Sequence, residues 1–529
     1  MRILLSLSLI FFIFQIGNAQ AVLDQNRDDG YIVQFENEQQ ADQYLHKHQI
    51  SITESQLISK SLLAYHFKLS SKNAYASVQD HQYLSLVKNE AVNYRAVPND
   101  DLFTTQWNLE LLEIEKAWDI STGGISPNGD TIVIAILDSG CDVNHEDIVD
   151  NLWKNKLEIP NDNIDNDGNN YVDDYVGLNL DTGDDKHRSD NHGTPVTGII
   201  GAAGNNLEGI SGINWNIKLM ILSNVRTVAK IIEAYQYVID QREKYDASNG
   251  EEGAYVVATN FSAGIANRFP SDFPTWCAMF DELGQAGILN VCSVANSNIN
   301  VDDVGDLPTL CTSPYLIAVT NTNRQDIKVS SAGFGMKNVD LGAPGESAPS
   351  TFPNNQYQNF NGTSSSAPHV SGVIGLLFSA DVCDKFSSLI KEEKAAAALL
   401  VKELILSGTD PLPSLNNITV SGGRLNAFKA LFRIDAFCNN ESQDLEIKVI
   451  YPNPASDQLN IEYRSPSANN ITMTVLNMLG QKVMEESLFP SFIESGMATV
   501  NVQNFAQGTY LIRLESGDMV LNRKIVVVR

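Results

Sequence analysis

The chain has 529 residues, enough for roughly three or four folded units at about 150 residues per domain. It carries 36 Lys and Arg against 64 Asp and Glu, so its formal net charge is −28. This acidity argues against nucleic-acid binding, which relies on neutralising phosphates with basic side chains, and against docking on an anionic membrane. A hydrophobic fraction of 43% excludes a disordered or fibrous chain.

Residues 1–19 have the pattern of a secretory signal peptide. Arg2 supplies a positive start, residues 3–14 form an apolar run, and residues 17–19 are small. The run is shorter than the ~20 apolar residues that span a bilayer, so a membrane anchor is the disfavoured alternative, and no later stretch predicts a transmembrane segment. Export permits disulfides among the six cysteines. Their spacing chooses no pairing, and buried free thiols are an equal alternative.

Residues 20–99 read as a small α+β unit, followed by a polar joint at residues 99–101 that we expect to be exposed. The unit's predicted strands are residues 31–35 and 61–67, and its predicted helices are residues 41–48 and 73–78.

In residues 100–436, short strands rich in Val and Ile alternate with helices, which predicts an α/β fold with a parallel sheet covered on both faces. The strands are expected at residues 131–137, 254–260, 287–294, 315–320 and 339–341, and the clearest helices at residues 194–203 and 228–241. After a polar linker at residues 437–446, residues 447–529 alternate with period two between turns, which predicts a small β-sandwich.

Three polar residues of the middle region stand beside apolar elements. Asp138 ends the apolar strand of Ala-Ile-Leu-Asp-Ser-Gly, and the carboxyl ends of such strands border the crevice where ligands bind. His192 precedes a helix in Asp-Asn-His-Gly-Thr-Pro-Val, and Ser364 lies where a loop becomes a helix in Asn-Gly-Thr-Ser-Ser-Ser-Ala-Pro-His-Val. Taken singly, they are as well explained by a turn, a structural histidine and a helix cap.

Together the three residues can cleave an acyl bond. A hydroxyl is a poor nucleophile near neutral pH unless a base takes its proton. An imidazole can take it, and a buried carboxylate fixes the imidazole tautomer. Ser364 is expected at the positive end of a helix, with Pro368 in the first turn, where an anion is stabilised. The Ser364 backbone N–H and the Asn296 side chain are candidate oxyanion donors.

The order Asp, His, Ser, with Asp-Ser-Gly, His-Gly-Thr and Gly-Thr-Ser-x-x-x-Pro-His-Val around them, resembles the subtilisin-like serine peptidases (subtilases, family S8). The resemblance spans residues 107–432 and implies a subtilisin-like fold and a secreted serine endopeptidase that forms an acyl-enzyme. It implies that Asp138 orients His192, which acts as general base and then acid. It also implies that Ser364 attacks and Asn296 donates to the oxyanion, without a catalytic cofactor.

The same resemblance assigns Ser262, Ala263 and Gly264 to a strand that pairs with the backbone of an extended peptide substrate. Two positions depart from the family's usual pattern. Ala295 stands where Gly usually precedes the oxyanion Asn, and Ser366 stands where Ala usually follows the nucleophile by two residues. Neither departure removes a reacting group. We therefore expect them to affect the catalytic efficiency and the shape of the first specificity pocket.

Two other classes of function stay open. A catalytically silent, subtilase-like secreted binding protein is the main alternative, and the departures at Ala295 and Ser366 are its only hints. Another serine hydrolase, such as an esterase, is disfavoured because no Gly-x-Ser-x-Gly elbow surrounds Ser364.

An acidic loop at residues 161–190 contains nine Asp and no Glu. Within it, oxygen ligands alternate around a glycine turn at Asn163, Asp165 and Asp167, and the pattern ends at Asp174. Hard oxygen ligands in a flexible loop suit a structural Ca²⁺, and the repulsion among unpaired carboxylates is a reason to expect a cation. A solvated acidic loop is the alternative.

The flanking units also resemble known modules. Residues 20–99 look like the inhibitor-type propeptide of subtilases, which implies assisted folding, a blocked cleft and self-cleavage near residues 98–101. Residues 447–529 contain Tyr-Pro-Asn-Pro-Ala-Ser-Asp and Gly-Thr-Tyr and resemble the sorting domain of type IX secretion cargo. An adhesive or carbohydrate-binding sandwich is the alternative for this last unit.

These resemblances imply three kinds of partner: protein or peptide substrates, the chain's own propeptide acting as inhibitor, and the type IX secretion machinery. They also imply a location outside the cell or on its surface, reached through the periplasm.

Overall fold

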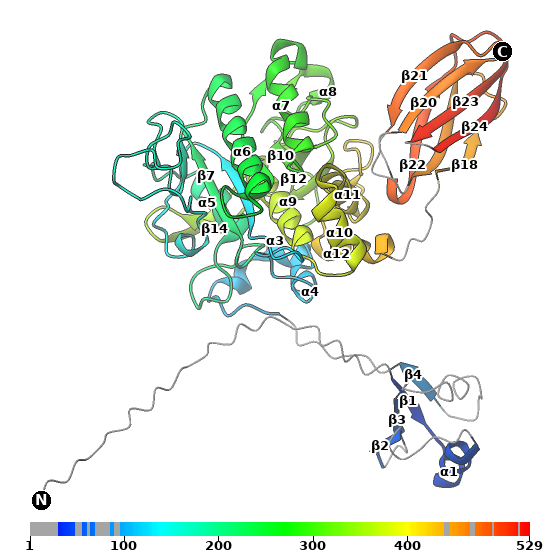
Figure 1. The fold of residues 1–529 in the computed structure, drawn as a ribbon, viewed down its shortest axis with the longest axis horizontal. Coiled ribbons are helices and arrows are strands. Elements are labelled where there is room, and N and C mark those ends of the chain that lie inside the picture. Colours follow the sequence, from blue (N-terminus) through cyan, green and yellow to red (C-terminus); the bar gives the residue numbers. More distant parts are fainter. Residues whose placement is uncertain are drawn as a thin grey trace, which may run out of the picture. The chain divides into compact units, whose positions relative to one another are not determined.

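A computed structural model (Figure 1) describes residues 30–47, 55–60, 64–68, 85–88, 96–438, 445–465, 471–488, 491–516 and 519–529. The chain divides into two units, Met1–Tyr94 and Arg95–Arg529. The predicted signal peptide at residues 1–19 and the predicted helix at residues 73–78 lie outside the described residues. No helix in the described part of the chain is long and apolar enough to cross a membrane.

The first unit contains a four-stranded antiparallel sheet and a helix. The sheet has the order β2 (Ser55–Ser59), β3 (Ala64–Lys68), β1 (Gly30–Gln34) and β4 (Ser85–Lys88). The helix α1 (Glu38–Lys47) buries Ala41 and Tyr44 in a small core with Val33 and Phe35. The expected strands at residues 31–35 and 61–67 and the expected helix at residues 41–48 match β1, β3 and α1. The strands β2 and β4 were not expected from the sequence.

The second unit is built on a nine-stranded sheet. Its strands are β5 (Ile132–Leu137), β6 (Gly177–Asn179), β7 (Lys218–Ser223), β8 (Tyr255–Phe261), β10 (Leu289–Ser293), β12 (Leu316–Thr322), β13 (Leu341–Pro344), β16 (Asp410–Pro411) and β17 (Gly423–Arg424). Their order is β16-β17-β13-β12-β10-β8-β5-β7-β6, and all neighbours are parallel except β16 and β17. The prediction of a parallel α/β sheet is confirmed.

Both faces of this sheet are buried by helices. Residues 132, 134 and 136 of β5 enter one core with α5 (Gly193–Gly201), α9 (Thr363–Phe378) and α11 (Lys394–Ser407). Residues 133, 135 and 137 enter the other core with α6 (Val228–Ser248) and α7 (Pro274–Gln285). In Figure 1, β10 and β12 accordingly lie between α7 and α9. A strand buried on both faces needs apolar residues at every position, which explains the Val- and Ile-rich runs.

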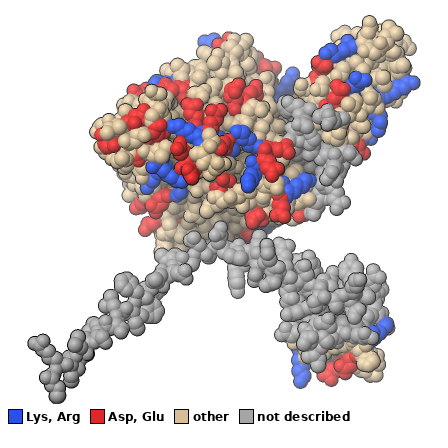
Figure 2. Space-filling view, in the orientation of Figure 1, with Lys and Arg blue, Asp and Glu red and all other residues tan. Residues whose placement is uncertain are grey.

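Shorter elements complete this part of the unit. They are α3 (Trp107–Leu111), α4 (Ile114–Trp118), α8 (Val301–Val304), α10 (Asp384–Glu392), α12 (Ala427–Cys438), β9 (Ile265–Ala266), β11 (Asp306–Leu307), β14 (Ala348–Phe352) and β15 (Gln356–Phe360). Acidic and basic side chains are interspersed on the face that Figure 2 shows.

Four of the six cysteines form two disulfides. Cys277 of α7 bonds to Cys311, and Cys383 before α10 bonds to Cys438 at the end of α12. Cys141 and Cys292 are buried free thiols. The sequence left the pairing open, and both bridges and thiols occur.

Residues 445–529 form two antiparallel sheets around a shared apolar core. One sheet contains β18 (Glu446–Tyr451), β19 (Gln458–Ser465) and β22 (Ser491–Asn501). The other contains β21 (Lys482–Leu488), β20 (Ile471–Asn477), β23 (Gly508–Ser516) and β24 (Met519–Val527). Side chains from both sheets enter one core, so the prediction of a small β-sandwich is confirmed. The helix α12 ends at Cys438, inside the predicted linker of residues 437–446.

Candidate active site

Three neighbouring parallel strands bring polar residues to one edge of the sheet. Asp138 follows β5 directly, Ser262 follows β8 directly, and Asn296 lies three residues beyond β10. Since β5 pairs with β8 and β8 pairs with β10 in parallel register, these residues meet at the carboxyl ends of the strands. Ligands of open α/β sheets bind at this edge.

Asp138 and His192 form a hydrogen-bonded pair. Nδ1 of His192 lies 2.8 Å from Oδ1 and 3.0 Å from Oδ2 of Asp138, which is buried. His192 immediately precedes α5, and the next residue, Gly193, packs against the end of β5. A Cβ built on Gly193 would overlap the carbonyl oxygen of Gly140 and lie 3.1 Å from Cβ of Asp138. Only glycine at position 193 lets the helix start this close to Asp138.

The surroundings of His192 stabilise its protonated form. Burial by itself lowers the pKa of His192, but the hydrogen bond to Asp138 and the negative charges of Asp138 and Asp190 outweigh it and raise the pKa above the usual value of 6.5. Asp190 also accepts the backbone N–H of His192 at 2.8 Å. The ring of Phe360 lies edge-on to the imidazole, with centroids 5.5 Å apart. The imidazole is therefore oriented and able to carry a positive charge.

Ser364 is the second residue of α9, where backbone N–H groups lack intrahelical acceptors. Its hydroxyl donates to the carbonyl oxygen of Ser262 at 3.0 Å, and its own carbonyl oxygen accepts from the Ser262 hydroxyl at 3.1 Å. Among the described residues, no hydrogen bond joins Ser364 to His192. The structure thus pairs Asp138 with His192 and holds the Ser364 hydroxyl on the strand end that was predicted to bind substrate.

The expectation that Pro368 lies in the first turn of its helix is wrong. The helix α9 already begins at Thr363, so Pro368 lies in its second turn. Proline has no N–H to donate to the carbonyl of the residue four positions earlier, which here is Ser364. The hydroxyl of Ser262 satisfies that carbonyl instead.

The side chain of Asn296 is anchored to the first turn of α9. Its Oδ1 accepts the backbone N–H of Thr363 at 3.0 Å and the Thr363 hydroxyl at 3.1 Å. These two donors identify the amide oxygen and leave the Nδ2 group as a donor. Gly362 permits this approach, because a Cβ there would lie 3.0 Å from Oδ1 of Asn296. Asn296 is exposed, so its N–H groups are available to a ligand.

A cavity of about 400 Å³ opens beside the Asp138–His192 pair. Ser262, Ala263 and Gly264, the residues expected to bind substrate, line it. Arg226, Phe261 and Trp276 are also part of its wall. The cavity therefore joins the proposed catalytic pair to the end of β8.

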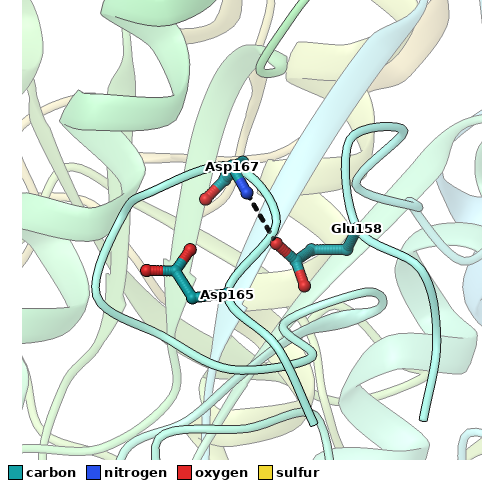
Figure 3. A group of neighbouring side chains, drawn as sticks. All are labelled: Glu158, Asp165 and Asp167. Atoms are coloured by element: carbon teal, nitrogen blue, oxygen red, sulfur yellow. Dashed lines mark hydrogen bonds between the residues drawn. The ribbon is translucent and has the colours of Figure 1, made fainter. Parts of the chain in front are cut away.

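An acidic cluster lies in the loop that was expected to hold a metal (Figure 3). Its members are Glu158, Asp165 and Asp167, whose ligand oxygens lie within 4.8 Å of one another. Glu158 accepts the backbone N–H of Asp167 at 3.1 Å through Oε1, while its buried Oε2 has no partner among the described residues. Lys244 compensates one charge by pairing with Asp167 at 2.9 Å.

Two of the four expected ligands lie outside this cluster. Asp174 is buried and accepts hydrogen bonds from the Tyr237 hydroxyl at 2.5 Å and from Asn169 at 2.8 Å. Asn163 donates its backbone N–H to Asp173 at 3.0 Å. The sequence pattern did not include Glu158, because it precedes the alternating oxygen ligands and only the fold of the loop brings it to Asp165 and Asp167.

The joint at residues 99–101 is not uniformly exposed as expected. Asp100 is buried and accepts the backbone N–H of Asn205 at 2.7 Å. The side-chain oxygen of Asn99 accepts the N–H of Leu207 at 2.9 Å. The loop that follows α5 thus holds this joint, which the local polarity of the sequence could not reveal.

Comparisons with known proteins assign families to two parts of the chain. Residues 129–409 match the family model of the subtilase family, and residues 449–528 match that of the secretion system C-terminal sorting domain. The second match identifies a type IX sorting domain and indicates secretion or cell-surface attachment.

Several curated proteins are similar to the chain. The "Subtilisin-like protease 1" of Plasmodium berghei is 29% identical over 309 residues, covering 53% of this chain and 48% of that protein. The "Major intracellular serine protease" of Bacillus subtilis is 28% identical over 320 residues, covering 59% of this chain and 87% of that protein. The matched part of the chain spans about half the length of the "Subtilisin-like protease 1" proteins of Plasmodium berghei and Plasmodium falciparum.

Among solved structures, a protease from Pseudoalteromonas arctica aligns with a TM-score of 0.47 and 23% identity, over 64% of this chain and 99% of that one. The subtilase match covers 281 residues (129 to 409), more than half of the 529. The chain therefore belongs to the subtilase family of serine proteases.

Proposed function

We propose that this chain is a secreted serine endopeptidase that hydrolyses peptide bonds through Asp138, His192 and Ser364. The observation that carries the proposal is the Asp138–His192 hydrogen bond at the mouth of a cavity lined by the end of β8. A buried carboxylate beside an imidazole fixes the ring with Nδ1 protonated, so that Nε2 is free to act as a base. The start of α9 supplies the hydroxyl.

The nucleophile has to change its hydrogen bond before it reacts. In the structure the Ser364 hydroxyl donates to the carbonyl of Ser262. We propose that bound substrate favours rotation about the Cα–Cβ bond of Ser364, so that the hydroxyl then donates to Nε2 of His192. Catalytic hydrogen bonds commonly form or tighten only in the substrate complex.

The reaction then follows two symmetrical steps. Oγ of Ser364 bonds to the peptide carbonyl carbon while its proton moves to Nε2 of His192. The C–N bond breaks as His192 returns that proton to the leaving amine, which gives an acyl-enzyme. Water next adds to the ester and loses a proton to His192. Collapse of this second adduct releases the acid and restores the Ser364 hydroxyl.

Two donors stabilise the oxyanion in both steps. We assign them to Nδ2 of Asn296 and the backbone N–H of Ser364. Thr363 holds the Asn296 amide from its oxygen side, so the donor is already oriented before charge develops. Preorganised donors of this kind are commonly the largest single contribution to catalysis.

A catalytically silent binding protein is the second candidate, and the Ser364–Ser262 hydrogen bond is the observation that favours it. The two candidates are separated by labelling the purified protein with a fluorophosphonate probe and by digesting casein. The peptidase proposal expects labelling and digestion that are both lost in Ser364→Ala. Wild-type protein that is folded but neither labels nor digests casein would leave the binding protein. Ester turnover without casein digestion would favour an esterase.

We also propose that residues 20–99 act as an inhibitor-type propeptide. The four-stranded sheet and helix of the first unit support a separately folding module. If the enzyme removes it by self-cleavage, Ser364→Ala should accumulate the uncut chain. A Ser364→Ala chain that is already shortened when expressed alone would contradict self-cleavage.

For the acidic cluster we propose a structural Ca²⁺ held by Glu158, Asp165 and Asp167. Three hard oxygen ligands and an unpartnered buried carboxylate oxygen fit such an ion. Burial and the nearby charges of Asp174 and Asp167 raise the pKa of Glu158 against the effect of its backbone hydrogen bonds. A bound cation would remove this penalty, and it would stabilise the loop without entering the reaction.

Export is proposed to pass through the periplasm, with the sorting domain read by the type IX machinery. Deletion of residues 447–529 should then trap the protein in the periplasm. Continued export of the truncated chain would contradict this route.

A further inference from the structure

Asp306 is a buried carboxylate that the proposed reaction does not use. It lies in β11 and is 2% exposed. Its Oδ2 accepts the backbone N–H of Ala295 at 3.0 Å and the hydroxyl of Thr309 at 2.8 Å. Among the described residues, no hydrogen bond or ion pair reaches its Oδ1. One oxygen is thus fixed and the other is left without a donor.

The position of Asp306 links the two parts of the site that would hold a substrate. Through Oδ2 it contacts Ala295, the residue before the oxyanion donor Asn296. Its strand β11 pairs antiparallel with β9, which directly follows Gly264. A Cβ built on Gly264 would lie 3.7 Å from Oδ1 of Asp306 and 2.5 Å from the carbonyl oxygen of Leu307. The free oxygen therefore lies next to Gly264.

The contacts proposed for a bound peptide define its path past these residues. Its scissile carbonyl must lie between Ser364 and the amide of Asn296, while its backbone follows Ser262–Gly264. The side chain of the residue before the cleaved bond is attached next to that carbonyl. In the proposed complex this side chain therefore lies beside Gly264 and Ala295, the two residues that Asp306 adjoins or contacts.

A buried carboxylate without a cation is energetically unfavourable. The described residues around Asp306 offer only neutral groups, namely the Thr309 hydroxyl, the Ala295 N–H and the buried Cys292 thiol. Burial raises the pKa of Asp306 to about 6, even though the hydrogen bonds from Thr309 and Ala295 act in the opposite direction. The carboxylate is therefore mostly ionised at neutral pH and lacks a counter-charge.

We propose that Asp306 is the specificity-determining residue of this site and pairs with a Lys or Arg side chain immediately before the cleaved bond. The inference rests on the proposed peptidase function. Oδ1 would accept a charge-assisted hydrogen bond from the ammonium or guanidinium group, while Ala295 and Thr309 keep the carboxylate in place. The disulfide Cys277–Cys311 ties the segment after Thr309 to α7, which limits its movement.

The chain itself contains a candidate substrate for such a pocket. Arg95 is the only Lys or Arg between Lys88 and Lys116, and it stands at the border of the two units. Self-cleavage after Arg95 would leave Ala96 as the new N-terminus. Asn99 and Asp100 would then keep their hydrogen bonds to the loop after α5.

The test uses the mature enzyme, produced from the full-length chain. Its substrates are quenched fluorescent peptides that differ only in the residue before the cleaved bond. Arginine is compared with citrulline, its neutral near-isostere, and lysine with norleucine. We expect kcat/KM to favour arginine over citrulline by roughly 100-fold. In Asp306→Asn this ratio should fall to near one.

Asp303→Asn is the matched control, because it removes one exposed carboxylate three residues away and should leave the ratio unchanged. If Asp306→Asn does not fold, the wild-type ratio is measured between pH 5 and pH 8. It should decrease as the pH falls through the pKa of Asp306, while the norleucine-to-citrulline ratio stays constant. A ratio that does not change with pH would contradict the proposal.

Two results separate this inference from the proposed function. Efficient hydrolysis of the neutral peptides, without preference for arginine or lysine, would overturn the role of Asp306 and leave the peptidase intact. Absence of hydrolysis of every peptide, together with absence of fluorophosphonate labelling, would overturn both. Mass spectrometry of the mature N-terminus is an independent readout, with Ala96 as the expected first residue.

Discussion

Gly193 lies so close to Gly140 that a methyl group on residue 193 would overlap the carbonyl oxygen of residue 140. The same methyl group would lie only 3.1 Å from Cβ of Asp138, the hydrogen-bond partner of the neighbouring His192. We therefore expect Gly193→Ala to lower kcat/KM by about 100-fold or more, since small misplacements of catalytic groups have effects of this size.

Steady-state kinetics with one peptide substrate would measure this effect. Gly508→Ala is the control, because no atom lies within 4 Å of a Cβ built at that position. Wild-type kinetics in a folded Gly193→Ala variant would show that the close approach of α5 to Asp138 is not needed.

The raised pKa of His192 predicts how the rate depends on pH. In the proposed reaction His192 must be neutral to take the proton of Ser364, so kcat/KM should rise with pH and level off above the raised pKa. Asp138→Asn removes the negative charge that helps to raise this pKa, so the midpoint should move to lower pH and kcat should fall roughly 10⁴-fold. A pH–rate profile of each variant measures both effects. A midpoint that Asp138→Asn leaves unchanged would assign the titration to another group.

The anchored amide of Asn296 predicts an effect on kcat rather than on KM. In the proposed mechanism Asn296→Ala removes a donor that acts only when negative charge develops, so kcat should fall roughly 10²–10³-fold with KM nearly constant. Asn298→Ala is the matched control, as an exposed asparagine two residues along the same loop. Equal losses in both variants would indicate damage to the loop instead of a lost donor.

Removal of a metal ion should be visible in the thermal stability. If Ca²⁺ binds at Glu158, Asp165 and Asp167, a chelator should lower Tm by on the order of 5 °C, and added Ca²⁺ should restore it. Asp165→Asn should lower the Tm and make it insensitive to the chelator, whereas Asp181→Asn, at an exposed aspartate beyond β6, should behave like wild type. A wild-type Tm that ignores the chelator would refute the calcium site.

The sequence predicted those parts of the structure that depend on local pattern. The buried parallel strands follow from uninterrupted apolar runs, and β5 carries Asp138 to the edge of the sheet as expected. The chemistry of the proposed site also follows from residue types, since a hydroxyl, an imidazole and a carboxylate have few other joint uses. Of these three groups, the structure joins Asp138 and His192 by a hydrogen bond, whereas the Ser364 hydroxyl donates to Ser262 instead.

What the sequence missed depends on contacts between distant segments. Glu158 joins the acidic cluster only through the course of its loop, and Asp100 is buried by residues about a hundred positions later in the chain. Asp306 follows two other aspartates of the same stretch, Asp302 and Asp303. Only the pairing of β11 with β9 distinguishes it from them and brings it beside Gly264.

The disulfide between Cys383 and Cys438 closes a covalent ring that ends before the sorting domain begins. Cys438 is the last residue of α12, so a cut anywhere in residues 439–445 would fall outside the covalent ring that the bridge closes. Such a cut would release the sorting domain after export and leave α12 covalently attached to the peptidase domain through the disulfide. Release of the sorting domain would then not require the peptidase domain to unfold.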